Sequence, residues 1–104
     1  MYQFARLSEH GVLDTTFGTT GKKTVDPTTY RFDILTNVKH TTNNDILVIG
    51  MSYDQGDKTN GVISRFTSSA NLDITFGTNG TTVLSMNSPN SYSLIEDVDV
   101  LPDG

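Results

Sequence analysis

The sequence predicts an all-β fold made of antiparallel strands, on three grounds. Thr, Ser, Asn and Gly are abundant whereas Glu and Lys are few, so residues that favour strands and turns outnumber those that favour helices. Several short runs alternate apolar and polar residues, as a strand with one covered face does. One phrase also occurs twice, as LDTTFGTTG at 13–21 and as LDITFGTNG at 72–80.

Composition narrows the possible partners. The 104 residues, of which 35% are hydrophobic, suffice for one small domain with a modest core. The net charge is −5 and the seven basic residues are scattered, which argues against nucleic acid or an anionic membrane as the main partner. There is no cysteine, which excludes disulfides and thiolate metal sites. No apolar run approaches the roughly 20 residues that membrane insertion as a helix needs, and the N-terminal residues lack the pattern of a signal peptide.

The repeated phrase belongs to a longer internal repeat. Eight of the twenty residues at positions 2–21 are identical to the residues 59 positions later. Further along the offset becomes 60, which pairs TNN at 42–44 with PDG at 102–104. A period near 60 is typical of a repeated supersecondary unit that buries its faces against neighbouring copies. The two copies cover approximately 1–44 and 45–104.

Each copy is expected to consist of short strands joined by turns. The run ILVIG at 46–50 is apolar on both faces, which predicts an interior strand that is covered from both sides. The other runs are either short and rich in Thr and Val or alternate apolar with polar residues. In chain order, the expected strands are 2–7, 22–25, 33–40, 46–50, 61–66, 81–84 and 93–100.

The connections between these strands carry turn residues. Asn43-Asn44 and Asp103-Gly104 tolerate positive φ, which predicts a tight two-residue hairpin at each place. The polar stretch MSYDQGDKTN at 51–60 contains a glycine and is expected to be an exposed loop.

These strings resemble a known repeat. The string FARL at 4–7, the phrase GVLDTTFGTTG at 11–21, the PDG turn and the strand ILVIG are similar to the delta-60 repeat, a β-propeller-like repeat of bacterial proteins that are often large and secreted or surface-associated. The resemblance spans essentially the whole chain. The chain departs from the family's usual Asp-Gly before the phrase, where it has His10-Gly11 in the first copy and Ser69-Ala70 in the second.

The resemblance implies a specific architecture and location. Antiparallel four-stranded repeat units would form β-propeller-like blades, and the chain would hold one complete blade plus two partial ones. An extracellular or cell-surface location follows from the same resemblance. Joining the end of one such chain to the start of another would omit one central strand and leave two open strand edges, which favour aggregation. We therefore expect a segment of a longer repeat protein.

The recurring carboxylates Asp14 and Asp73 are expected to be structural. An aspartate at the start of such a turn accepts hydrogen bonds from backbone amides of the turn, while the following phenylalanine fills the space between neighbouring units and the glycines permit sharp bends. Arg6 and Arg65 recur too, and each is expected either to pair with a carboxylate of the adjoining strand or to cover the edge of a blade. The structural motif comprises Leu13, Asp14, Phe17, Gly18, Gly21, Leu72, Asp73, Phe76, Gly77 and Gly80.

Other candidate sites carry weaker signals. Asp54, Asp57 and Asn60 could supply oxygen ligands to Ca²⁺, but their spacing is not that of an EF-hand loop. The acidic run from Glu96 to Asp103 is expected to be a solvated edge. Neither of the two histidines has a partner at a recognisable spacing, and no nucleophile elbow or phosphate-binding loop is present. We expect no cofactor and no enzymatic activity.

The sequence thus favours a structural or binding repeat module of a larger extracellular or surface protein. Its loops would contact a protein or a glycan, and its other partners would be further repeats of the same chain or of identical chains. The alternative is a self-assembling filament or fibre subunit joined through open β-strand edges.

Overall fold

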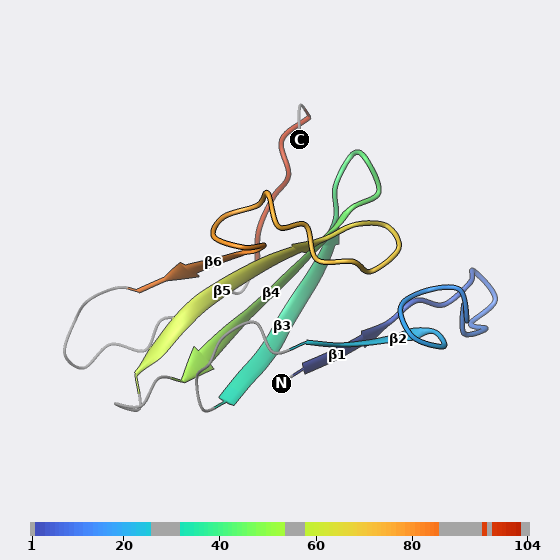
Figure 1. Ribbon diagram of the computed structural model, residues 1–104, viewed down its shortest axis with the longest axis horizontal. Coiled ribbons are helices and arrows are strands. Elements are labelled where there is room, and N and C mark those ends of the chain that lie inside the picture. Colours follow the sequence, from blue (N-terminus) through green and yellow to red (C-terminus); the bar gives the residue numbers. More distant parts are fainter. Residues whose placement is uncertain (1, 26–31, 54–57, 86–94, 96, 103–104) are drawn as a thin grey trace.

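The structure, a computed structural model, describes residues 2–25, 32–53, 58–85, 95 and 97–102. Two antiparallel sheets are formed there, one of two strands and one of four (Figure 1). No helix in the described ranges is long and apolar enough to cross a membrane. The strands are β1 (Tyr2–Ala5), β2 (Lys22–Val25), β3 (Phe32–His40), β4 (Ile46–Tyr53), β5 (Thr59–Phe66) and β6 (Thr81–Leu84). The all-β prediction is confirmed.

The larger sheet has the strand order β3-β4-β5-β6, so strands that are consecutive in the chain are neighbours in the sheet. β3 and β4 pair from His40 opposite Ile46 outward, with one bulge at Thr36, between the paired residues Leu35 and Asn37. β4 and β5 are in register over eight residue pairs, and β6 pairs with the middle of β5, from Gly61 opposite Leu84 to Ser64 opposite Thr81. Each of these four strands lies where the sequence predicts one: β3 and β5 from alternation, β4 from its apolar run and β6 from its short run rich in Thr and Val.

β4 is the interior strand that its apolar run predicts. All residues from Ile46 to Gly50 are buried, and Val48 and Ile49, whose side chains point to opposite faces, are both fully covered. The strand is also longer than the apolar run, because it continues to Tyr53.

One face of this sheet is covered by the first sheet and the loop that joins its strands. β1 and β2 pair from Tyr2 opposite Val25 to Ala5 opposite Lys22, and β1 lies beside β3 (Figure 1). The ring of Phe4 in β1 is edge-on to the rings of Phe17 and Phe66, at centroid distances of 5.8 and 5.3 Å. The buried core between the sheets consists of Phe17, Val25, Ile46, Val48, Phe66 and Ala70.

The opposite face is contacted by the C-terminal segment. Ile95 lies over Gly61 of β5, so closely that a Cβ atom on this glycine would be 2.5 Å from Ile95 Cγ1. The Thr36 hydroxyl, at the bulge of β3, is 2.8 Å from the Ile95 carbonyl oxygen. Further along, Asn37 Nδ2 donates to Asp97 Oδ1 at 3.0 Å.

Three sequence predictions need correction. The predicted strand at 93–100 is not a strand at its described residues, which are held by side-chain hydrogen bonds to β3 instead of a backbone ladder. The hairpin at Asn43-Asn44 is not a two-residue turn, because residues 41–45 connect the paired His40 and Ile46; only Asn44 has positive φ, at 62°. The predicted loop 51–60 is shorter, since its two ends continue β4 and β5.

Candidate functional site: the repeated corner and its two pockets

The first copy of the repeated phrase folds into a corner, residues 13–21, centred on Asp14. One carboxylate oxygen of Asp14 accepts from the backbone amide of Thr16 at 3.0 Å and from the Thr16 hydroxyl at 2.5 Å. The other oxygen accepts from Nε of Arg6 at 2.9 Å. The carboxylate therefore closes its own turn, as the sequence predicts. It also holds Arg6, whose partner thus lies in the turn and not on an adjoining strand.

The second corner, residues 72–80, repeats these contacts 59 residues later. Asp73 accepts from the amide and the hydroxyl of Thr75 at 3.0 and 2.6 Å. Nε of Arg65 lies 3.3 Å from the second Asp73 oxygen. The backbone amides of Asp14 and Asp73 also donate to the carbonyls of Arg6 and Arg65, at 2.9 and 2.8 Å. Two sequence copies thus adopt one local structure.

The backbone angles of the two corners agree just as closely. Three left-handed positions have φ values of 57°, 52° and 94° in the first corner and 55°, 53° and 93° in the second. At the last of them a glycine is required twice over, because its φ suits no other residue and because the leucine that begins the corner packs against it. The positions are Gly18, Thr20 and Gly21 in the first corner and Gly77, Asn79 and Gly80 in the second.

The electrostatics of the corner favour ionised carboxylates. Hydrogen bonds from Thr16, then from Arg6, lower the pKa of Asp14 below its ordinary value. Hydrogen bonds from Thr75 and the charge of Arg65 lower the pKa of Asp73 in the same way. Carboxylates of this kind stay charged at neutral pH, so they are poorly suited to act as general acids.

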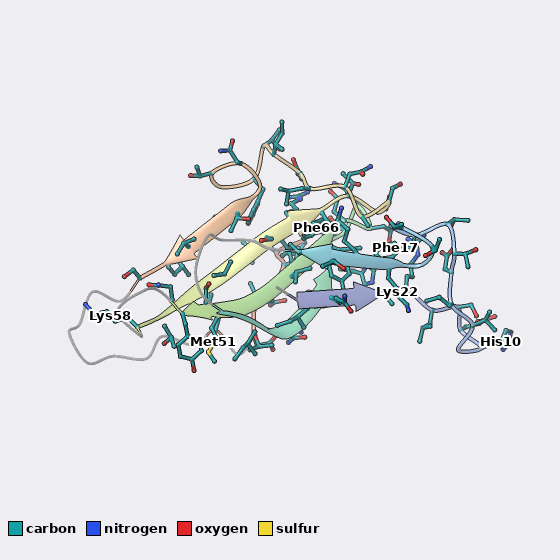
Figure 2. The ribbon with its side chains drawn as sticks, turned by 60° about the horizontal axis from the view of Figure 1, so that its bottom comes forward. His10, Phe17, Lys22, Met51, Lys58 and Phe66 are labelled. Atoms are coloured by element: carbon teal, nitrogen blue, oxygen red, sulfur yellow. The ribbon has the colours of Figure 1, made fainter. Side chains whose placement is uncertain are left out.

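The first corner packs between the two sheets. Phe17 is fully buried and touches the core residues of the larger sheet, and the guanidinium of Arg6 lies 4.7 Å above its ring. Nη1 of Arg6 donates to the carbonyl oxygen of Ser68 at 2.8 Å. Figure 2 shows Phe17 near Phe66, at the end of β5. Ala70, two residues beyond Ser68, is buried in the same core.

The segment that docks on the first corner is therefore the turn at 67–70, which follows β5. We call it the second turn; the first turn is its equivalent at 8–11, after Arg6 and Leu7. Ala70 adopts φ of 70°, where Gly11 has 78°. An alanine in this conformation is uncommon, and its burial against Phe17 gives it a packing role that glycine could not fill.

The second corner lacks such a covering segment among the described residues. Phe76 is partly exposed where Phe17 is fully buried, and it has no ring partner there. Arg65 pairs with Asp45 through Nη2 at 2.9 Å, whereas its Nη1 has no acceptor in the described part of the chain to match the Ser68 carbonyl. The two corners share a structure but differ in what covers them.

Each corner borders a pocket. The first pocket, of about 130 Å³, lies between the two sheets. The second, of about 240 Å³, lies between the larger sheet and the C-terminal segment. Arg65 and Phe76 line the second pocket. Their equivalents 59 residues earlier, Arg6 and Phe17, line the first. The first pocket is lined by Phe4, Ala5, Arg6, Phe17, Val38, His40 and Ile46. The second is lined by Thr41, Leu47, Arg65, Phe76, Asp99, Val100 and Leu101.

The other candidate residues do not gather into a site in the described part of the chain. Asn60 of the Ca²⁺ candidate lies buried in β5, opposite Ser52, while Asp54 and Asp57 lie outside the described residues. No group of three or more acidic or histidine residues is placed to hold a metal within the described ranges. Figure 2 shows exposed His10 at the opposite end of the molecule from Lys58.

Both described carboxylates of the acidic C-terminal run, Asp97 and Asp99, are exposed as expected, and Asp97 is in addition bonded to β3. Asp97 accepts from Asn37, and Nζ of Lys39 lies 3.1 Å from its carboxylate. The hydrogen bond from Lys39, then the one from the Val98 amide, lower the pKa of this carboxyl group. Asp99 lies at the second pocket and is exposed. Sequence reasoning also missed the docking of the second turn on the first corner. The available signal was Ala70 in a place where the first copy has glycine.

A comparison of the chain with models of protein families, with curated proteins and with solved structures finds no match.

Proposed function

We propose that the chain is a non-catalytic repeat module of a larger extracellular or surface protein, in which corners join successive sheets into a propeller-like stack. The observation that carries this proposal is the contact at the first corner. There Phe17 and Arg6 bind the second turn, which follows β5 of the larger sheet. The second corner has the same local structure and lies on the next sheet. Repetition of one packing contact is how repeat proteins accumulate stability.

The chemistry of the corner supports a structural role. Both recurring carboxylates are engaged with a threonine and an arginine, and their pKa values are lowered, away from the neutral range that a general acid or base needs. The resemblance of LDTTFGTTG to the delta-60 repeat supports both the propeller-like arrangement and the surface location. Loops at the ends of the sheets would then supply the contacts with a protein or a glycan.

A tandem chain tests the packing role. A second copy of residues 45–104 joined after Gly104 continues the repeat in register, because PDG at 102–104 occupies the place of TNN at 42–44. We expect the added unit to cover Phe76 and to raise the melting temperature by at least about 5 °C, with a single cooperative transition. The same tandem chain with Phe76→Ala serves as the control and should lose most of this gain.

A tandem chain that unfolds in two independent steps, with the first at the melting temperature of the 104-residue chain, would contradict the proposal.

A further inference from the structure

Within its described residues, the chain packs a turn onto a corner once. The first turn and the second corner, with its pocket, are equivalent surfaces that do not make this contact there. In that contact, the second turn covers the first corner. We infer that the first turn of a second copy of this chain docks on the second corner, so that copies associate head to tail. This inference rests on the packing role proposed above for the corner.

The receiving side is the second corner with the pocket beside it. Phe76 is partly exposed, and Nη1 of Arg65 has no acceptor among the described residues, although the corresponding atom of Arg6 binds the Ser68 carbonyl. Leu101 adds an apolar side chain at the rim of the pocket and is 67% exposed. The position therefore offers an aromatic ring, a hydrogen-bond donor and an apolar rim.

The entering side is the first turn with the leucine that precedes it. Its backbone is that of the second turn: the amide of Ser8 donates to the Val12 carbonyl at 2.8 Å, and the amide of Thr67 donates to the Asn71 carbonyl at 2.7 Å. The amide of the fourth turn residue donates to the carbonyl of the first at 2.9 Å in both turns. A turn of the shape that fits the first corner is thus presented again.

The apolar side chains that flank the first turn are exposed to solvent. Leu7 is 58% exposed, whereas Phe66, its equivalent before the second turn, is 1% exposed in the core. Val12, just after the first turn, is 64% exposed. Large apolar side chains that are exposed on both sides of a turn favour a partner surface over solvent.

The contact would be heterologous, because the first turn of one copy meets the second corner of another. Such contacts leave one turn and one corner free in a pair of chains, so they extend into rings or open chains. Docking does not require two chains to complete one sheet. In the contact within the chain, the Ser68 carbonyl and Ala70 bind the first corner from the turn that follows β5, and not from a strand. β1 has only β2 as a strand partner among the described residues, so docking opens no new edge.

Complementation between two surface variants tests the inference. Leu7→Asp blocks the turn side and Leu101→Asp blocks the corner side, and both residues are exposed enough for the fold to tolerate the change. Ile34→Asp is the control, because Ile34 of β3 is an exposed apolar residue, at 43%, but belongs to neither corner and lines neither pocket. Far-ultraviolet circular dichroism confirms folding, and sedimentation velocity follows mass from micromolar to millimolar concentration.

We expect the unaltered chain and Ile34→Asp to associate with rising concentration, and each blocked variant alone to associate at least about tenfold more weakly. An equimolar mixture of Leu7→Asp and Leu101→Asp should form a discrete pair, because it retains one intact turn and one intact corner. A monomeric unaltered chain, or a mixture that stays monomeric, would overturn the inference. If the tandem chain is stabilised while the unaltered chain stays monomeric, the packing role stands and only the head-to-tail association fails.

Discussion

At the scale of single residues, the two corners have the same backbone but carry different residues at one left-handed position. Thr20 and Asn79 occupy the same left-handed position, with φ of 52° and 53°. A β-branched residue is strained in this region, whereas asparagine tolerates it. The first corner therefore stores strain that the second avoids.

Exchange of these two residues tests this. Thr20→Asn should raise the free energy of unfolding by about 0.5–1 kcal/mol, and Asn79→Thr should lower it by a similar amount. The hydroxyl of Thr20 donates to the Thr19 carbonyl at 2.7 Å, but this contact is exposed and its loss should cost little. Urea unfolding measures both variants, with the dependence on urea concentration unchanged. Shifts of the same sign in the two variants would show that the backbone angle is not the cause.

At the scale of elements, the corner is a unit held by its carboxylate, which makes its stability depend on pH. The pKa of Asp14 in the folded chain is lowered from 3.8, so the unfolded chain takes up a proton first as the pH falls. The stabilisation by this group is therefore complete above that value and is lost as the pH falls through the lower folded value.

Asp14→Asn removes the charge but keeps an oxygen that can accept from the Thr16 amide. We expect the variant to melt at a lower temperature than the unaltered chain at pH 7, because the ion pair with Arg6 is lost. The difference should narrow as the pH falls below 3.8. Thermal melts by circular dichroism over this range make the comparison, and Asp73, left intact, serves as the internal reference. A difference that is constant with pH would exclude the carboxylate as its source.

Most strands were predictable from the sequence, and the wrong predictions have identifiable physical causes. The run from Ile46 to Gly50 could only be an interior strand, and its neighbours alternate clearly. The segment at 93–100 alternates as well, yet its described residues form no strand, because alternation does not supply a pairing strand. The contacts of Ile95 and Asp97 with β3 are made through side chains that no periodicity reports.

The candidate site was predictable in its parts but not in its assembly. The roles of Asp14 and Phe17 follow from turn chemistry and from recurrence. That Ser68 and Ala70 dock against them does not follow, because this contact joins residues about 60 positions apart in the sequence. The sequence signal for it was Ala70, which stands where the first copy has Gly11.

At the scale of the whole molecule, the same aromatic side chain has two environments. Phe17 is fully covered between two sheets, whereas Phe76 is partly exposed beside the second pocket. If corners serve to join sheets, the covered phenylalanine should contribute far more to the stability of this chain than its partly exposed equivalent, although their local structures agree.

The most direct test is the free energy of unfolding of Phe17→Ala and Phe76→Ala in the 104-residue chain. Phe17→Ala should cost about 3–5 kcal/mol, as expected for truncation of a fully buried phenylalanine, and Phe76→Ala should cost less than about 2 kcal/mol. Urea denaturation at neutral pH measures both, with the same slope as the unaltered chain. Equal losses in the two variants, or a small loss in Phe17→Ala, would contradict the claim that the corner joins one sheet to the next.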